Sequence, residues 1–78
     1  MKLEIRLFAT LRDLLPKENK GKTQVELPEG STVDDLIKML NIPEDLPLII
    51  MLNGRRETED IKLKENDRIG IFPPVGGG

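Results

Sequence analysis

The segment that determines how this chain folds is Thr32-Val33-Asp34-Asp35-Leu36-Ile37-Lys38-Met39-Leu40. Its apolar residues recur at positions i, i+3, i+4 and i+7, which predicts a helix with one apolar face. Thr32 can cap the first turn with its hydroxyl, and Asp35 completes a capping box. The adjacent Asp34 and Asp35 suit the positive end of the helix dipole, so we interpret them as a solvated helix start and not as a catalytic carboxylate pair. Asn41 and Pro43 end the helix.

Two strands are expected before this helix. Charged and apolar residues alternate over residues 2–7, and Thr23, Val25 and Leu27 alternate with Gln24 and Glu26, which predicts two half-buried strands paired antiparallel. Between them, Leu11, Leu14 and Leu15 have helical spacing, and Pro16 follows. This predicts one or two helical turns packed against a sheet edge and then a polar loop over residues 16–22.

Three strands are expected after the helix. They cover residues 48–52, 55–58 and 67–72, and Asn53-Gly54 between the first two is typical of a type I′ hairpin turn. Because the helix acts as a crossover connection, the last strand can lie parallel beside the first. The sequence therefore predicts an α+β fold: a mixed four- to five-stranded sheet, covered on one face by one main helix.

Strand parity assigns a second group of apolar residues to the uncovered face of this sheet. The group consists of Phe8, Ile49, Met51, Gly70 and Phe72. An exposed apolar cluster usually marks a protein interface. The alternative is that Phe8 and Met51 fill gaps at the ends of the core.

The C-terminal residues Pro73-Pro74-Val75-Gly76-Gly77-Gly78 carry no side-chain pattern that could join the core. Two prolines stiffen the chain and three glycines loosen it, so we expect a domain over residues 1–72 and a flexible projecting tail over 73–78. The tail can reach about 20 Å when extended, which is enough to enter a narrow pocket of another protein. The alternatives are a frayed end or a linker remnant.

Composition argues against several classes of function. The 78 residues contain no Cys and no His, which removes the usual nucleophile–base pairs and the common zinc sites, so we expect no metal and no self-contained enzyme. A net charge of −2, with 3% aromatic residues, disfavours nucleic acid as a partner. The longest apolar run is too short to span a bilayer and no signal peptide is evident, so we expect a cytoplasmic protein with no membrane contact.

Three segments resemble the ubiquitin-like β-grasp sulfur carriers of the MoaD/ThiS type, and most of all the small subunit of molybdopterin synthase. They are residues 7–15 (LFATLRDLL), residues 52–54 (LNG) and residues 63–75 (LKENDRIGIFPPV) ahead of the terminal glycines. The resemblance covers nearly the whole chain, and Phe-Pro-Pro-Val before the glycines is its most specific part. The chain departs from the family pattern at Gly76, where Ser or Ala is common, and at Asn66, where Gly is common.

The resemblance implies a function for the C-terminus. A carboxylate is a poor electrophile, so an adenylyltransferase partner resembling ubiquitin-activating enzyme would use ATP to adenylate Gly78, and sulfur transfer would give a thiocarboxylate. Gly76 and Gly77 would give access to the partner's channel. The large subunit of molybdopterin synthase would then accept the sulfur for a pterin precursor. The expected partner-binding residues are Phe8, Ile49, Met51, Phe72, Pro73, Pro74 and Val75. No cofactor is expected to bind the chain itself.

Other acceptors are compatible with the same chemistry. The chain could carry sulfur for thiamine synthesis or tRNA thiolation, or could be a modifier joined through Gly78 to lysines of other proteins. A β-grasp interaction domain with an inert tail is the remaining alternative. What separates these functions is the acceptor, which the sequence does not contain.

Overall fold

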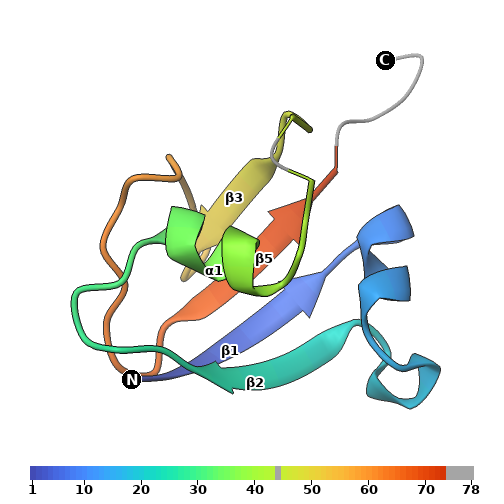
Figure 1. The fold of residues 1–78 in the computed structure, drawn as a ribbon, viewed down its shortest axis with the longest axis horizontal. Helices are drawn as coiled ribbons and strands as arrows, with labels where there is room; N and C mark the ends of the chain where they lie inside the picture. Colours follow the sequence, from blue (N-terminus) through green and yellow to red (C-terminus); the bar gives the residue numbers. More distant parts are fainter. Residues whose placement is uncertain (44, 74–78) are drawn as a thin grey trace.

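The computed structural model describes residues 1–43 and 45–73. These residues form a five-stranded mixed sheet in the order β2-β1-β5-β3-β4 (Figure 1). The bounds are β1 Lys2–Leu7, β2 Lys22–Glu26, β3 Ile49–Leu52, β4 Arg55–Glu57 and β5 Arg68–Phe72. The helix α1, Val33–Met39, lies across one face of the sheet. This is the β-grasp architecture that the sequence predicts.

The two long strands at the centre of the sheet are parallel. β1 pairs with β5 in register from Glu4↔Arg68 to Leu7↔Ile71, and β1 also pairs antiparallel with β2. β3 pairs antiparallel with both β4 and β5. The crossover through α1 brings the ends of the chain to neighbouring strands, because a parallel pair cannot be joined by a tight turn. The predicted parallel pairing of the first and last strands is confirmed.

The expected capping box starts α1. The Thr32 hydroxyl accepts a hydrogen bond from Asp35 N at 3.3 Å, and Asp35 Oδ2 accepts one from Thr32 N at 2.9 Å. The helix ends before Asn41, which has a positive φ of 60°. The side chains of Asp34 and Lys38 form an exposed ion pair on the outer surface, which agrees with the interpretation of Asp34 as part of a solvated helix start.

The core lies between α1 and the sheet, and strand parity decides which residues enter it. Among the described residues, twelve buried apolar ones form one cluster, half of them on β1, β3 and β5. Those six are Leu3, Ile5, Leu7, Ile50, Ile69 and Ile71. Leu48 and Leu52, which the parity of the predicted strand also assigned to the helix side, are half-buried and pack against the cluster. The expected apolar face of the helix is largely confirmed, because Val33, Leu36 and Ile37 are buried and Leu40 packs against the core.

The segment after β1 differs from the expectation. Residues Ala9–Leu14 form a 3₁₀ helix, η1, and a second short one, η2, spans Lys17–Asn19 inside the expected loop. Leu11 is buried and Leu15 packs against the core, but Leu14 is 44% exposed. The prediction that Leu14 shares their face is wrong, because the tighter 3₁₀ turn and the extended conformation of Leu15 break the α-helical face.

Candidate partner-binding face

The face of the sheet opposite α1 carries the apolar residues that the sequence assigns to it. Each of Phe8, Ile49, Met51 and Phe72 is half-buried. None of the four belongs to the core cluster or to the half-buried residues packed against it. The interpretation of Phe8 and Met51 as core filling is therefore wrong. We call these four residues together with Gly70 the apolar patch.

A stacked pair of phenylalanine rings forms the centre of the apolar patch. The ring centroids of Phe8 and Phe72 are 4.1 Å apart and the ring planes differ by 5°. Phe8 N also donates a hydrogen bond to Ile71 O at 3.2 Å, which holds the end of β1 beside the end of β5. Ala9 follows in the left-handed conformation, with a φ of 54°, and turns the chain away from the sheet directly after the ring. Ring stacking and this backbone hydrogen bond therefore keep both rings on the face of the sheet opposite α1.

Gly70 allows the rings to lie flat on the strand. A Cβ built on Gly70 would lie 3.3 Å from Cε1 of Phe8, 3.6 Å from Cε1 of Phe72 and 3.8 Å from Cβ of Met51. The register places Gly70 beside Arg6 on one side and Met51 on the other. An open depression of about 450 Å³ lies here, lined by Glu4, Arg6, Phe8, Met51, Asn53, Gly54, Arg68, Ile69, Gly70 and Phe72. A side chain at position 70 would fill part of its floor.

The tail begins at the edge of this patch. Phe72 is the last residue of β5 and pairs with Ile49, and Pro73 follows it as a half-buried residue. The expected tail and partner-contact residues Pro74, Val75, Gly76, Gly77 and Gly78 lie outside the described residues, and so does the reactive carboxylate expected on Gly78. A partner that covers the apolar patch would thus meet the chain where the tail starts.

A polar network at one end of the depression is not evident from local sequence patterns. Asp67 is 8% exposed and accepts hydrogen bonds from Asn53 Nδ2 at 2.9 Å and from Lys64 N at 2.7 Å. Asn53 Oδ1 in turn accepts from Arg68 N at 2.9 Å. Asn53 and Gly54 have φ values of 50° and 85°, as the predicted type I′ turn requires. The network joins the β3–β4 hairpin to the start of β5.

The described residues contain no group of three or more Asp or Glu side chains arranged to hold a metal ion. Within the same residues, no helix has the length and apolar character needed to cross a bilayer. The described part of the site is thus an apolar surface that ends at Pro73.

The profile of the ThiS family matches residues 5–78. This chain belongs to the ThiS family. A search of curated proteins gave no match. The chain has the fold of the small sulfur carriers and ubiquitin-like proteins of the ThiS/MoaD type, which are not themselves catalytic.

Several solved structures resemble this ThiS-family chain. A Pyrococcus furiosus protein assigned as molybdopterin converting factor, subunit 1, is 32% identical, with a TM-score of 0.75 over 96% of this chain and 99% of that one. The small archaeal modifier protein 1 from Methanosarcina acetivorans is 25% identical, with a TM-score of 0.69 over 99% and 96% of the two chains.

A third structure is similar in fold alone. It is a protein–protein complex of subunits 1 and 2 of molybdopterin-converting factor from Helicobacter pylori. The matching chain is 24% identical, with a TM-score of 0.62 over the full length of both chains.

Proposed function

We propose that this chain is the sulfur carrier and small subunit of a molybdopterin synthase. The observation that carries the proposal is the position of the apolar patch. The stacked rings of Phe8 and Phe72 lie on the face of the sheet opposite α1, and Phe72 directly precedes Pro73, where the tail starts. One partner surface can therefore cover the patch and receive the tail together. The resemblance to the Pyrococcus protein over nearly both chains supports the molybdopterin branch of the family.

The chemistry takes place on the carboxylate of Gly78. In the first step, an ATP-using adenylyltransferase joins one carboxylate oxygen to the α-phosphorus of ATP, and pyrophosphate leaves. In the second step, a sulfide-level donor attacks the acyl carbon and AMP leaves, which yields a thiocarboxylate. The acids and bases of both steps would belong to the partner enzymes. ATP serves the partner, and the carrier holds no cofactor of its own.

The described residues position the partner protein relative to the tail. The patch holds the partner at the base of the tail, and residues 73–78 can span about 20 Å from there when extended. Gly76 and Gly77 lack Cβ atoms and can pass through a channel that a larger residue would block. The large synthase subunit would bind the same face and take the sulfur for the pterin precursor. We place this work in the cytoplasm, where ATP and a reduced sulfur donor are both available.

A second candidate function follows from the resemblance to an archaeal modifier protein. Attack of a lysine amine on the acyl carbon of the same adenylate would release AMP and join Gly78 to another protein through an isopeptide bond. Activation is common to both functions and to sulfur carriers for thiamine or tRNA. The reaction product therefore distinguishes sulfur transfer from protein modification. A sulfur carrier gives a thiocarboxylate that the large synthase subunit consumes, whereas a modifier gives a protein conjugate of higher mass.

Mass spectrometry of the activated chain tests the proposal. Incubation with the activating enzyme, ATP and sulfide should raise the intact mass by the difference between sulfur and oxygen, with fragmentation placing the change at Gly78. Deletion of Gly78, or addition of one Ala after it, should abolish sulfur transfer, because reacting atoms must approach to about 3 to 3.5 Å. Both variants should melt like the parent and still bind through the patch. Full sulfur transfer by both variants would refute the proposal.

A further inference from the structure

Charge is distributed unevenly along this chain. Residues 1–22 contain six basic and three acidic residues, a net charge of +3, whereas residues 23–78 contain six basic and eleven acidic residues, a net charge of −5. The whole chain has a charge of only −2, so its surface field comes mainly from this separation. The basic part comprises β1, η1, η2 and the start of β2.

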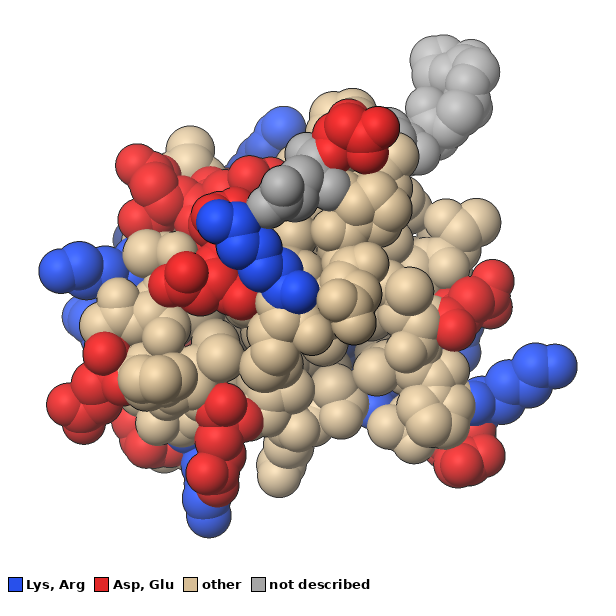
Figure 2. All heavy atoms as spheres, viewed as in Figure 1, with Lys and Arg blue, Asp and Glu red and all other residues tan. Residues whose placement is uncertain are grey.

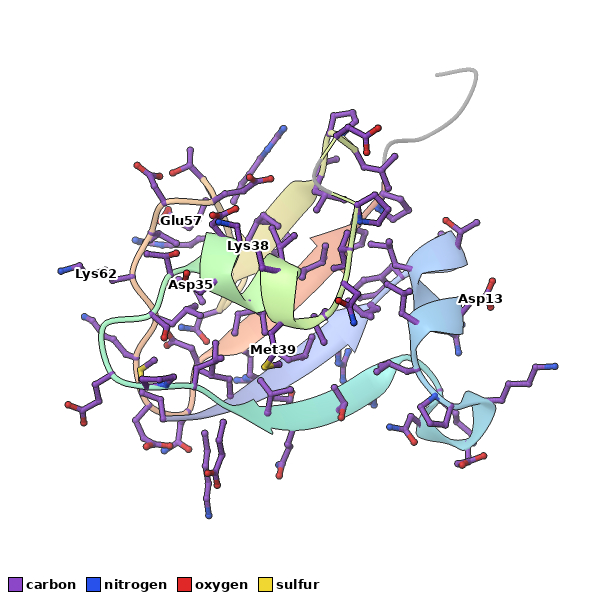
Figure 3. The ribbon with its side chains drawn as sticks, viewed as in Figure 1. Asp13, Asp35, Lys38, Met39, Glu57 and Lys62 are labelled. Atoms are coloured by element: carbon purple, nitrogen blue, oxygen red, sulfur yellow. The ribbon has the colours of Figure 1, made fainter. Side chains whose placement is uncertain are left out.

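Several carboxylates of the acidic part lie together on the helix side of the molecule (Figure 2 and Figure 3). Asp34 N donates to Glu59 O at 2.8 Å, which holds the loop after β4 against the start of α1. Glu57 shares this side, because it pairs with the buried Ile50. Figure 2, which views the molecule from the helix side, shows carboxylates grouped over this region, and Figure 3 locates Asp35 and Glu57 there.

The basic part forms a notch beside the apolar patch. The notch holds about 120 Å³ and is lined by Arg6, Leu7, Phe8, Arg12, Lys20, Gly21 and Lys22, which include four cations and no carboxylate. Each of the four cationic residues is exposed. None of them forms an ion pair with a carboxylate in the part of the chain that the structure describes.

Backbone contacts bring these cations together. The β1–β2 register places Lys22 opposite Arg6, and Leu7 N donates to Gly21 O at 2.7 Å. Lys20 and Gly21 both have positive φ values, 54° and 79°, which turn the chain from η2 back into the sheet. Arg12 packs over Gly21, since a Cβ built there would lie 3.0 Å from the Arg12 Nε. Four like charges are thereby held at one corner of the fold.

The notch and the apolar patch are continuous. Arg6 and Phe8 line both the notch and the larger depression that contains Phe72 and Met51. A partner protein large enough to cover the apolar patch therefore also reaches the notch. The cations of the notch are exposed and its volume is small. The notch is therefore better suited to binding side chains from a protein surface than to enclosing a small free anion.

We propose that the notch receives carboxylates of the large synthase subunit, from an acidic segment that flanks the apolar pocket for Phe8 and Phe72. This inference rests on the proposed function and names the chemistry of its partner. The cations attract the acidic segment while the carboxylates around α1 repel it, so the carrier approaches the large subunit with its apolar patch foremost. Such complementarity acts mainly on the association rate.

The test compares two double variants that remove the same charge from different places. Lys20→Gln with Lys22→Gln neutralises the notch. Lys62→Gln with Lys64→Gln is the matched control, because both residues are exposed and lie after β4; Figure 3 shows Lys62 on the opposite side of the molecule from Asp13 of η1. Association and dissociation rates with the large subunit are measured by stopped flow over a series of NaCl concentrations. Thermal melting of each variant checks its fold.

The notch variant should associate about tenfold more slowly than the control at low salt, and its association rate should depend less on salt. Dissociation should change less than about threefold, since the patch is intact. Equal association rates for the two double variants, with a parent that binds and transfers sulfur normally, would overturn the acidic-segment inference and leave the proposed function standing. A parent that does not bind the large subunit at any salt concentration would overturn both.

Discussion

Replacing Asn53 with Ala should destabilise the fold far more than its place in an exposed hairpin turn suggests. Asn53 occupies a left-handed position, with a φ of 50°, where Ala is strained by about 1 kcal/mol. Its side chain also makes two hydrogen bonds that Ala cannot replace, one to the carboxylate of Asp67 and one from the backbone of Arg68.

The expected loss in the free energy of unfolding follows from these contacts. A hydrogen bond to a charged group contributes about 1.5 kcal/mol at the lower end of its range, which is appropriate because Asn53 is exposed. The bond from the Arg68 amide adds about 1 kcal/mol. With the backbone strain included and partial replacement by water allowed for, Asn53→Ala should lower the free energy of unfolding by about 3 kcal/mol. For a chain of this length, this corresponds to a fall in Tm of about 12 to 24 °C.

Asn41 provides the matched control. It also has a positive φ, of 60°, but its side chain makes no hydrogen bond within residues 1–43 and 45–73. Asn41→Ala should therefore cost only the backbone strain of about 1 kcal/mol. Urea titrations of both variants and the parent, monitored by circular dichroism, give the change in the free energy of unfolding for each variant. If the two variants agree within about 0.5 kcal/mol, the network around Asp67 does not stabilise the fold and the reasoning is refuted.

Three further predictions concern α1 and the apolar patch. Thr32→Ala removes the acceptor for Asp35 N and should lower the free energy of unfolding by about 1 kcal/mol, measured by urea denaturation; an unchanged midpoint would contradict the capping role. Phe72→Ala should weaken binding to the large synthase subunit by about 2 kcal/mol or more while the fold persists, as measured by calorimetric titration. Gly70→Ala places a methyl group 3.3 Å from the Phe8 ring, so it should weaken the same binding several-fold with little loss of stability; unchanged affinity in both patch variants would show that the patch is ordinary surface.

Local patterns in the sequence were enough to predict most of the architecture. Strand alternation assigns Leu3 and Ile5 to the core and the apolar patch to the opposite face, because side chains alternate strictly along an extended chain. The capping box and Asn41 delimit α1, and Asn53-Gly54 predicts the hairpin turn, since each signal acts within a few residues. The parallel pairing of β1 with β5 follows from one helix between them.

The contacts between distant segments follow from the three-dimensional packing and not from local patterns. The flat stack of Phe8 on Phe72, the network between Asn53 and Asp67 and the cationic notch each join residues whose separation depends on strand register and on irregular backbone. Periodicity assigns a side chain to a face but does not place it along that face. The exposure of Leu14 has the same origin, because a 3₁₀ turn rather than an α-helix follows β1. Strand parity therefore indicates which residues lie on the uncovered face of the sheet, while the packing of the sheet sets which of them lie close enough to act together.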